Sequence, residues 1–369
     1  MPVASGWQGQ IVATQIVATP AGFAKSSWPV YDVSPYMEGR NKNTKVVVVG
    51  GANLDIHGIS LAPFSLRDSN PGRIARASGG VGRNIAENCA KLGLSTSLVT
   101  AFGEDREGDF LLADCAAKGI DTEWSLRAPG RTAIYLCALD PDGSLVAAVA
   151  DMDIMAALSP DLLETRRPLF DSADYLVADA NLPADSIRWL AEHYGRKARS
   201  TSRKSKPLLY FDTVSAAKAP RASGLSGEFD CMKPNRIEAA ILAGREGSAT
   251  GLATPEMLCA AMAGRECLPA ELFISLGEEG LYYYVDETEN GRVSLPPPGL
   301  RPSPVNRSGA GDAACAALVW ATSIGCTPRE KAKYGLAAAL LAAASPEPVA
   351  VGISESMLEA QMRLMFPEE

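Results

Sequence analysis

The chain carries the stretch Asn306-Arg307-Ser308-Gly309-Ala310-Gly311-Asp312, and an Ala-rich segment, Ala313 to Ser323, follows it. Small residues let the backbone approach a ligand closely. A helix beginning at the end of this stretch would direct unpaired N–H groups at an anion, with Asp312 beside them. Phosphoryl transfer needs such donors and a base for the attacking hydroxyl. The alternative is a Gly-rich turn whose Asp caps a helix.

Outward from this stretch, short apolar runs alternate with helical patterns. Lys45–Val49 is a continuous β-branched run that Gly50 and Gly51 end, which is typical of a parallel strand buried on both faces. Further strands are expected at Thr96–Phe102, Tyr175–Ala178, Leu208–Phe211, Leu272–Ser275 and Leu281–Val285. Helices are expected between them, for example at Arg83–Leu92, Gly108–Lys118, Ser186–His193, Arg236–Ala243 and Pro255–Gly264. The alternation predicts a doubly wound, mainly parallel α/β sheet.

Two segments break this alternation and predict a small β-sheet lid over the open sheet. Residues 56–78 contain two prolines, and residues 131–149 are typical of a hairpin with a turn at Asp140-Pro-Asp-Gly143. We assign the lid to about 56–78 and 131–150, within one domain over residues 44–369. Residues 1–43 are interpreted as an N-terminal extension, with targeting as the alternative. The basic, Ser-rich insertion 196–206 is expected to be a surface loop, or else a docking site.

Composition narrows the class of protein. The chain has 369 residues, 47% of them hydrophobic, and a net charge of −8. The negative charge gives no reason to expect nucleic acid as a partner, and no apolar run reaches the length of a membrane span. Eight Cys without CxxC spacing, beside two His, argue against a structural zinc site. Buried free thiols in a reducing compartment, the cytoplasm, are the simplest account.

Two motifs predict where a small-molecule substrate binds. Asn53 and Asp55 follow the first strand at its carboxyl end, where open α/β sheets bind ligands, and their spacing lets both face one site. Asp55 could accept two hydrogen bonds from a vicinal diol; a turn held by Asn and Asp side chains is the alternative. The run Ser78-Gly79-Gly80-Val81-Gly82-Arg83-Asn84 leads into a helix. Its glycines expose bare backbone to a substrate, and the alternative is a structural turn with an Asn cap.

Two further motifs predict a nucleotide side. Asn235 and Glu238 stand three apart at a helix start, where a carboxylate and an amide can order a hydrated Mg²⁺. The same spacing fits a capping box. Ser275-Leu276-Gly277-Glu278-Glu279-Gly280 ends a strand and could contact a nucleotide through its backbone and hydroxyl.

In this order, the motifs resemble the PfkB (ribokinase-like) carbohydrate kinase family, over roughly Lys45 to the C-terminus. The family's N-terminal signature is similar to Gly79–Gly93, and its C-terminal signature to Asn306–Asp312. Other segments are similar to the pseudouridine kinase branch of that family: Gly80–Asn88, Ala150–Ile154, Asp179–Pro183, Ser215–Lys218 and Lys233–Ala239. Ribokinase itself typically carries Lys where Val81 stands here, which argues against free ribose as substrate.

The resemblance implies roles for individual residues. Asp312 would be the catalytic base, and the amides of Gly309, Ala310 and Gly311 the anion hole. The remaining expected roles are ribosyl or substrate binding by Asn53, Asp55, Gly79, Gly80 and Asn84; ATP binding by Asn235, Ser275, Gly277, Gly280, Asn306 and Ser308; and Mg²⁺ binding by Glu238. Many members carry Asp where Asn306 stands, so a requirement for K⁺ is left open.

The activity implied is ATP-dependent phosphorylation of the 5′-hydroxyl of pseudouridine, giving pseudouridine 5′-phosphate. The residues expected near the base are Thr132, Asp151, Asp153 and Asn181. One alternative is a kinase of the same fold that acts on an N-nucleoside or a free sugar. Another is a non-catalytic member that binds nucleoside or ATP. The resemblance also allows a homodimer through the lid.

Overall fold

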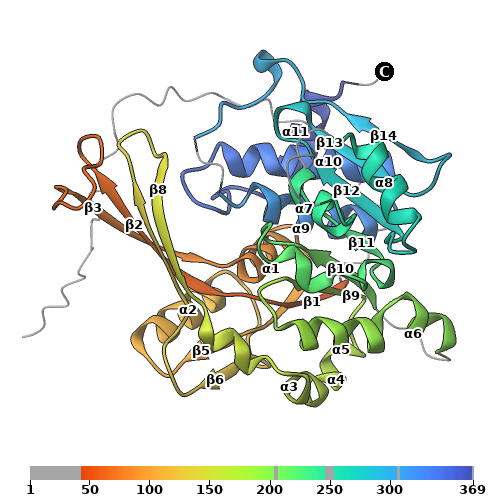
Figure 1. Ribbon diagram of the computed structural model, residues 1–369, viewed down its shortest axis with the longest axis horizontal. Coiled ribbons are helices and arrows are strands. Elements are labelled where there is room, and N and C mark those ends of the chain that lie inside the picture. The colour runs from red at the N-terminus through yellow and green to blue at the C-terminus, as the bar shows by residue number, and fades with distance from the viewer. Residues whose placement is uncertain (1–42, 203–206, 246–252, 306–307, 368–369) are drawn as a thin grey trace, which may run out of the picture. The chain divides into compact units, whose positions relative to one another are not determined.

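The computed structural model describes residues 43–202, 207–245, 253–305 and 308–367. Its main element is an eight-stranded sheet in the order β14-β13-β12-β11-β10-β9-β1-β4 (Figure 1). Neighbouring strands are parallel from β4 to β12, and the last two pairings are antiparallel. The strands are β1 (Lys45–Val49), β4 (Ser95–Val99), β9 (Tyr175–Asp179), β10 (Leu208–Asp212), β11 (Cys231–Met232), β12 (Glu271–Ser275), β13 (Leu281–Tyr284) and β14 (Asn290–Val293). The predicted doubly wound, mainly parallel sheet is confirmed.

Helices cover both faces of this sheet, as the side chains along β1 show. Val46 and Val48 pack into one hydrophobic core, whereas Val47 and Val49 pack into another. The first core receives side chains from α1 (Val81–Lys91), α2 (Arg106–Ala117), α9 (Ala310–Ser323), α10 (Pro328–Ala343) and α11 (Glu355–Met365). The second receives them from α3 (Pro160–Thr165), α4 (Arg167–Phe170), α5 (Ala184–Tyr194), α7 (Arg236–Leu242) and α8 (Pro255–Ala263).

A smaller sheet begins directly after β1, at the carboxyl end of that strand. Its order is β3-β2-β7-β8, with β2 and β7 parallel and the outer pairs antiparallel. Its strands are β2 (Asn53–Ser60), β3 (Gly72–Gly79), β7 (Ile134–Leu139) and β8 (Leu145–Asp151), and β2, β3 and β8 run side by side in Figure 1. The expected small sheet and its hairpin are therefore present. A two-stranded parallel sheet joins β5 (Ala101–Gly103) to β6 (Leu126–Ala128).

Short 3-10 helices occupy several of the connections: η2 (Asp153–Ala157), η3 (Ala219–Ala222), η4 (Ser226–Glu228), η5 (Gly277–Glu279) and η6 (Pro298–Leu300). Of the helices in the described ranges, none combines the length and apolar character needed to cross a bilayer. The eight cysteines, which all lie in the described ranges, form no disulfide, and all are buried except the partly exposed Cys326.

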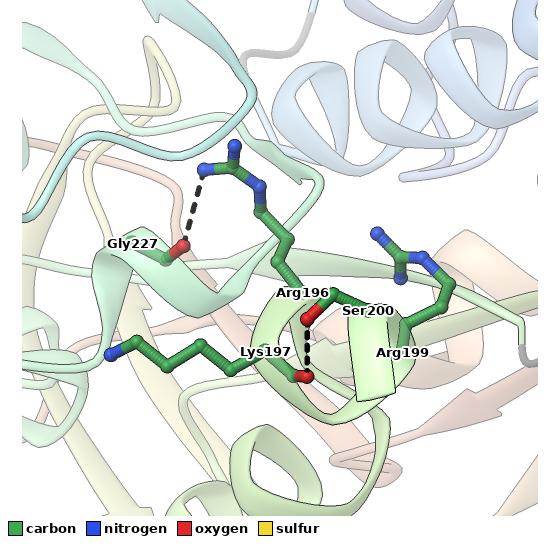
Figure 2. Close-up of a pocket in the computed structure, with 5 residues that line it drawn as sticks. All are labelled: Arg196, Lys197, Arg199, Ser200 and Gly227. Carbon is green, nitrogen blue, oxygen red and sulfur yellow. Dashed lines mark hydrogen bonds between the residues drawn. The ribbon is translucent and has the colours of Figure 1, made fainter. Parts of the chain in front are cut away.

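The basic insertion differs from the sequence prediction, because it begins as a helix and not as a loop. Helix α6 (Arg196–Thr201) has no buried residue and frames an exposed hollow (Figure 2). Lys197 pairs with Glu228, Arg199 pairs with Asp230, and Arg196 donates to the carbonyl of Gly227. These partners on the neighbouring segment explain why a Ser-rich, charged stretch adopts a helical turn. Residues 203–206 lie outside the described ranges.

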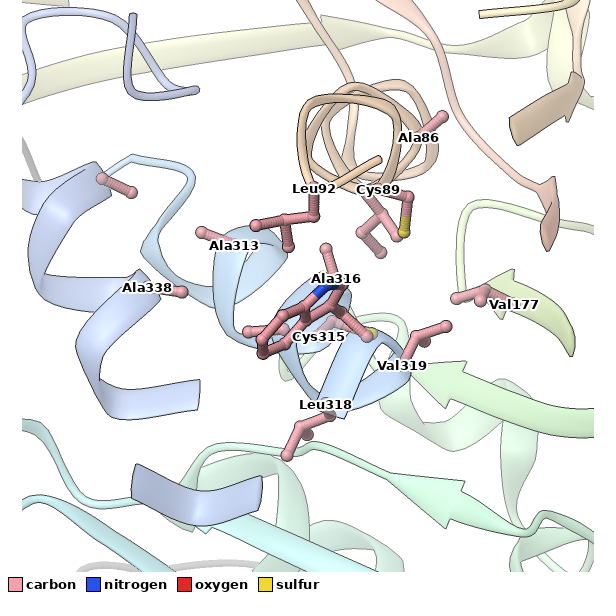
Figure 3. Packing of buried hydrophobic residues seen from close by; sticks show 14 of the residues in the cluster. Ala86, Cys89, Leu92, Val177, Ala313, Cys315, Ala316, Leu318, Val319 and Ala338 are labelled. Atoms are coloured by element: carbon pink, nitrogen blue, oxygen red, sulfur yellow. The ribbon is translucent and has the colours of Figure 1, made fainter. Parts of the chain in front are cut away.

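Helix α9 lies at the centre of the first core, which fixes the position of its N-terminus. Ala313, Cys315 and Leu318 are buried in the same cluster as Cys89 of α1 and Leu92, which follows that helix (Figure 3). Small residues along α9 allow this close packing, whose density gives it a single arrangement. The start of α9 is therefore held rigidly beside the start of α1.

Candidate active site

The start of α9 offers unpaired backbone amides. Gly309 precedes the helix with a φ of 77°, and α9 has no side-chain cap hydrogen bond among the described residues. A Cβ at Gly309 would lie 1.9 Å from the carbonyl oxygen of Pro348, so this position requires glycine. An uncapped helix start needs an acceptor from outside the helix, and an anion is the partner that its dipole favours. This geometry agrees with the expected anion hole at Gly309, Ala310 and Gly311.

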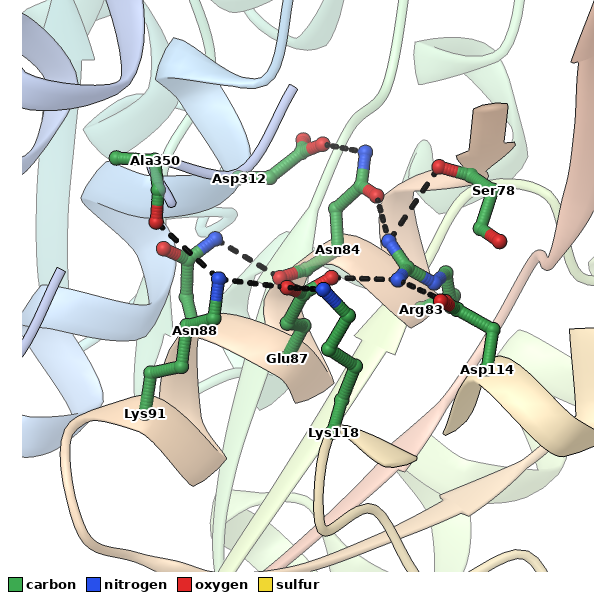
Figure 4. Close-up of polar contacts among 10 residues, drawn as sticks. All are labelled: Ser78, Arg83, Asn84, Glu87, Asn88, Lys91, Asp114, Lys118, Asp312 and Ala350. Atoms are coloured by element: carbon green, nitrogen blue, oxygen red, sulfur yellow. Dashed lines mark hydrogen bonds and ion pairs between the residues drawn. The ribbon is translucent and has the colours of Figure 1, made fainter. Parts of the chain in front are cut away.

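Asp312 lies in the first turn of α9 and is buried, with an exposed fraction of 8%. The side chain of Asn84, in α1, donates from Nδ2 to Asp312 Oδ2 over 2.9 Å (Figure 4). Burial, followed by the charge of Asp212, raises the pKa of Asp312 to about 7, against the opposing effects of Asn84 and Lys233. A pKa close to neutrality suits a group that accepts a proton and releases it again.

An ion pair lies beside this carboxylate. Lys233 Nζ stands 3.2 Å from Asp212 Oδ2, and both side chains are buried. Burial alone would lower the pKa of Lys233, but the neighbouring Asp212 carboxylate raises it, so the ammonium stays charged. A Cβ at Gly311 would lie 3.3 Å from Lys233 Nζ, so the ammonium is directly below the first turn of α9. The first turn of α9 thus places its backbone donors next to a buried positive charge.

A third carboxylate, Asp179, shapes the carboxyl end of β1. It accepts hydrogen bonds from the amide of Gly51 at 2.9 Å and from that of Asn181 at 2.7 Å. Burial raises the pKa of Asp179. A Cβ at Gly50 would lie 2.4 Å from Asp179 Oδ2, which explains the paired glycines after β1. Asn181 Oδ1 accepts from Lys218 Nζ, which directs the Asn181 amide N–H groups away from that lysine.

The first substrate motif lies on β2, next to the Gly-rich turn. Asn53 Nδ2 donates to Asp55 Oδ1 over 2.5 Å, so the two side chains meet on one face as their alternation predicted. Burial raises the pKa of Asp55, and Asn53 opposes that effect. A Cβ at Gly79 would lie 2.2 Å from Asp55 Oδ2, and one at Gly80, where φ is 97°, would lie 2.5 Å from a carbonyl oxygen. Both glycines are needed to bring this motif beside the start of α1.

The expected magnesium pair forms a capping box at the start of α7. Glu238 Oε2 accepts from the Asn235 amide at 2.9 Å and from the Thr213 hydroxyl at 2.5 Å, while Asn235 Oδ1 accepts from the Glu238 amide. Among the described residues, no group of three or more His, Cys, Asp or Glu side chains could hold a metal ion directly. One buried carboxylate with an adjacent amide still fits Mg²⁺ that keeps most of its waters. The capping role and a role toward hydrated Mg²⁺ are compatible.

Other residues of the expected nucleotide side lie close to this pair. Ser275 forms a β-bridge with Asn235, and its amide donates to Pro234 over 3.0 Å. Gly277 has a φ of 62° with open space where a Cβ would be, whereas a Cβ at Gly280 would lie 2.1 Å from Val293 O. Gly280 therefore serves the turn into β13. Ser308 is exposed before α9, and Asn306 lies outside the described ranges.

Two residues expected near a base are placed differently. The Thr132 hydroxyl donates to Asp105 and accepts from the amide of Gly103, so its hydrogen-bonding capacity is used at the start of α2. Asp151, at the end of β8, pairs with Ile134 of β7, which in turn pairs with Leu54 of β2. The three residues form one row across the small sheet. Alternation along a strand puts this row on the face opposite Asp55. Asn181 remains at the carboxyl end of β9, and Asp153 begins η2 with its side chain exposed.

The sequence prediction missed Asp179, Asp212 and Lys233 as site residues. A usable signal existed, because each of the two aspartates ends a buried strand whose carboxyl end faces the ligand side of an open sheet. Lys233 begins a segment that resembles a branch of the family, but the strand before it has only two residues and gives no pattern from which to place the side chain. The position of the Lys233 ammonium group depends on how α9 packs against it, which the sequence alone does not reveal.

The comparison with known proteins agrees with this geometry. The sequence profile of the pfkB family carbohydrate kinases matches residues 43–351, and the chain belongs to that family. It is therefore a phosphotransferase of the ribokinase-like fold. A pseudouridine kinase of Escherichia coli (strain K12) is 32% identical over 285 residues, covering 74% of this chain and 82% of that protein.

Two other relatives are similar. A sugar kinase of the same organism, YeiI, is 30% identical over 300 residues, which cover 81% of this chain and 78% of that protein. The structure of Arabidopsis thaliana ribokinase complexed with ribose and ATP aligns with a TM-score of 0.69, at 22% identity, over 86% of this chain and 99% of that one. The latter likeness concerns the fold alone.

Proposed function

We propose that this chain transfers the γ-phosphoryl group of ATP to the 5′-hydroxyl of pseudouridine. The observation that carries the chemistry is Asp312: a buried carboxyl group with a pKa of about 7, held beside the uncapped start of α9. The choice of substrate is supported by the 32% identity with the E. coli pseudouridine kinase over most of both chains. It is also supported by the five segments similar to that branch of the family.

In the proposed mechanism, Asp312 accepts the proton of the attacking hydroxyl. The first-turn amides of α9 and the ammonium of Lys233 stabilise negative charge on the phosphoryl group as it moves between oxygens. Asn53, Asp55, Gly79, Gly80 and Asn84 hold the ribosyl part of the nucleoside. Ser275, Gly277, Gly280 and Ser308 line the ATP side, and Asn306 is proposed to do so from outside the described ranges.

Glu238 and Asn235 would hold Mg²⁺ through its waters, and the bound ion would neutralise charge on the phosphates. Residues 44–369 form the proposed kinase domain, in which the small sheet acts as a lid that excludes water from the site. Free thiols persist in a reducing compartment, which supports a cytoplasmic location.

Asn181 is the residue that we propose contacts the uracil base. Its Oδ1 accepts from Lys218 and its NH₂ group also donates to Asp179, which leaves one of its two N–H groups for a uracil carbonyl. Asp151 and Thr132 are less suited to that role than their positions in the sequence indicated.

We also propose a homodimer through the small sheet. The face opposite Asp55 exposes large apolar side chains: Ile74 at 71%, Leu136 at 46% and Val149 at 65%. They belong to neighbouring rows of β3, β7 and β8. A contiguous apolar face of this kind is more typical of an interface than of a free surface. A dimer by light scattering, converted to monomer by Leu136→Lys, is expected; a wild-type monomer at micromolar concentration would contradict the interface.

The proposed activity is tested by measuring ATP consumption with pseudouridine, uridine, adenosine and ribose as acceptors. Pseudouridine is expected to give the fastest turnover and a product heavier by one phosphoryl group at the 5′ position. A preference for adenosine or ribose would point to another kinase of the same fold. Absence of turnover with every acceptor would favour a non-catalytic binding protein.

A further inference from the structure

Arg83 has a side chain that the proposed mechanism does not use, although it is buried next to the site. It follows the Gly-rich turn at the start of α1, and its exposed fraction is 3%. Its Nη1 donates to Asn84 Oδ1 over 3.0 Å and to the carbonyl of Ser78 over 3.4 Å. Its Nη2 contacts Glu87 at 2.5 Å and Asp114 at 2.6 Å (Figure 4). The guanidinium group is thus held from several directions.

The contact with Asn84 determines which way that amide group points. A guanidinium group has donors only, so the atom of Asn84 that faces Arg83 must be the carbonyl oxygen. The NH₂ group then faces Asp312, to which it donates over 2.9 Å. A flipped amide would put a donor against Arg83 and an acceptor against the carboxylate, and would lose both bonds.

We propose that Arg83 is a positioning residue that orients the Asn84 amide and, through it, holds Asp312 as an ionised base. This inference rests on the proposed role of Asp312 in catalysis. It also predicts what Asn84 offers to a nucleoside, namely an N–H donor for a hydroxyl oxygen and not an acceptor.

The rest of the cluster keeps Arg83 from moving. Glu87 also pairs with Lys91 at 2.7 Å and with Lys118 at 3.5 Å, so the cluster joins α1 to the end of α2. Lys91 donates in turn to the carbonyl of Ala350 over 3.2 Å. Buried carboxylates held in this way tolerate little displacement of the guanidinium group between them.

Other titratable groups face Asp312 and remain in place when Arg83 is replaced. They come from three strand ends and from α9 itself: Asp179, Asp212, Lys233 and Cys315. The groups that face Arg83, besides its two carboxylate partners, are Asp55 and Cys115. A change in the titration of Asp312 in an Arg83 variant must therefore come through Asn84 or directly from the lost charge.

The test compares the pH profile of kcat in four variants of the full chain: Arg83→Met, Arg83→Lys, Asn84→Ala and Arg83→Met with Asn84→Ala. Arg83→Met takes away the ion-pair contact of Asp114 and one of the three cations around Glu87, and so risks unfolding. Arg83→Lys keeps the positive charge. Its ammonium group is compact and is attracted to the two carboxylates, so it cannot also donate to Asn84 Oδ1 as the planar guanidinium group does. Lys91→Met is the matched control, because it breaks a Glu87 ion pair in the same cluster without touching Asn84.

Arg83→Met, Arg83→Lys and Asn84→Ala are each expected to move the acid limb of the profile upward by about 0.5 to 1 pH unit, the size expected for a hydrogen bond to a carboxylate. Lys91→Met should leave the limb unchanged. When Asn84 is already replaced by Ala, adding Arg83→Met should move the acid limb by less than about 0.2 pH units more, because Arg83 can no longer act through the Asn84 amide. An equal shift in both backgrounds would show a direct effect of charge and overturn the proposal, as would a wild-type limb in Arg83→Lys.

A second readout separates this inference from the identity of the substrate. The carboxyl ¹³C signal of Asp312, assigned by its loss in Asp312→Asn, can be titrated in the absence of any acceptor. Its midpoint should shift upward in Arg83→Lys by the same amount as the acid limb. A protein without kinase turnover that still shows this shift would refute the proposed function and retain the role of Arg83. An unmoved midpoint would refute the role of Arg83 alone.

Discussion

Lys233 and Asp212 form a buried ion pair, with 3.2 Å between Nζ and Oδ2, directly below the first turn of α9. The pair neutralises one of the carboxylates that end neighbouring strands. Asp312 lies outside the pair, and its burial, followed by the charge of Asp212, raises its pKa to about 7 although the amide of Asn84 donates to it. Asp312 is therefore a group able to exchange a proton near neutral pH.

Replacing Asp312 by Asn should remove the base while keeping its shape. We expect turnover to fall by about 10² to 10⁴, the range typical for loss of a general base, with ATP affinity nearly unchanged. Steady-state rates and the dissociation constant of ATP would be measured on the same preparation. A variant that keeps more than about a tenth of wild-type turnover would show that Asp312 is not the base.

The raised pKa of Asp312 also predicts how stability depends on pH. Between the ordinary value of 3.8 and about 7, the folded state holds a proton that the unfolded state has lost. The free energy of unfolding contributed by this group therefore decreases as pH rises through that window. Asp312→Asn removes the cost, so the variant should be more stable than wild type at pH 8, by at least about 1 kcal/mol.

This gain should shrink toward pH 4, where the wild-type carboxyl is protonated in the folded state and becomes increasingly protonated in the unfolded state. Urea unfolding of both proteins at pH 8 and at pH 4.5 measures the difference. Equal differences at the two pH values would mean that the pKa of Asp312 is not raised by folding.

Glu238→Gln should raise the Mg²⁺ concentration needed for half-maximal rate more than it changes nucleoside affinity. Glutamine can keep one acceptor for the Asn235 backbone amide and the Thr213 hydroxyl, so the capping box itself is kept, while the charge and the acceptor for Asn235 Nδ2 are lost. Asn235→Ala, which removes the cap itself, serves as the comparison for helix stability. Mg²⁺ titrations of wild type and Glu238→Gln that overlay would limit Glu238 to its capping role.

We expect K⁺ to stimulate the enzyme weakly or not at all. Asn306 offers a carbonyl oxygen but no formal charge to hold a cation. Rates in K⁺ and in a large organic cation at equal ionic strength provide the comparison. A stimulation by K⁺ of more than about fivefold would show that the charge at this position is dispensable.

The elements that could be predicted from the sequence are those with a continuous pattern. The β-branched run of β1 predicted a parallel sheet, and the Ala-rich segment after Asp312 predicted the helix α9. Strand β11 could not be found, because two residues carry no periodicity. Helix α6 was predicted as a loop, because its stability comes from partners such as Glu228 and Asp230 that are distant in sequence.

The same reason limits what could be predicted of the site. Asp312 and its glycines form a local motif, so their arrangement could be predicted from spacing. The contact between Asn84 and Asp312 joins residues 228 positions apart and depends on how α1 packs against α9. Distant contacts also explain the position of Thr132. It was expected on the lid near the base, but its hydroxyl forms hydrogen bonds with Asp105 and with the amide of Gly103.

Choice of substrate tests the account most directly. Pseudouridine presents an extra ring N–H where uridine has C–H, and a site built around that donor leaves a buried polar group unpaired when uridine binds. Both nucleosides would be supplied in one vessel with limiting ATP, so that the ratio of the two phosphorylated products gives the ratio of kcat/KM. We predict that pseudouridine 5′-phosphate exceeds uridine 5′-phosphate by at least about tenfold, roughly the effect of one hydrogen bond. Equal amounts of the two products, or an excess of uridine 5′-phosphate, would contradict the assignment.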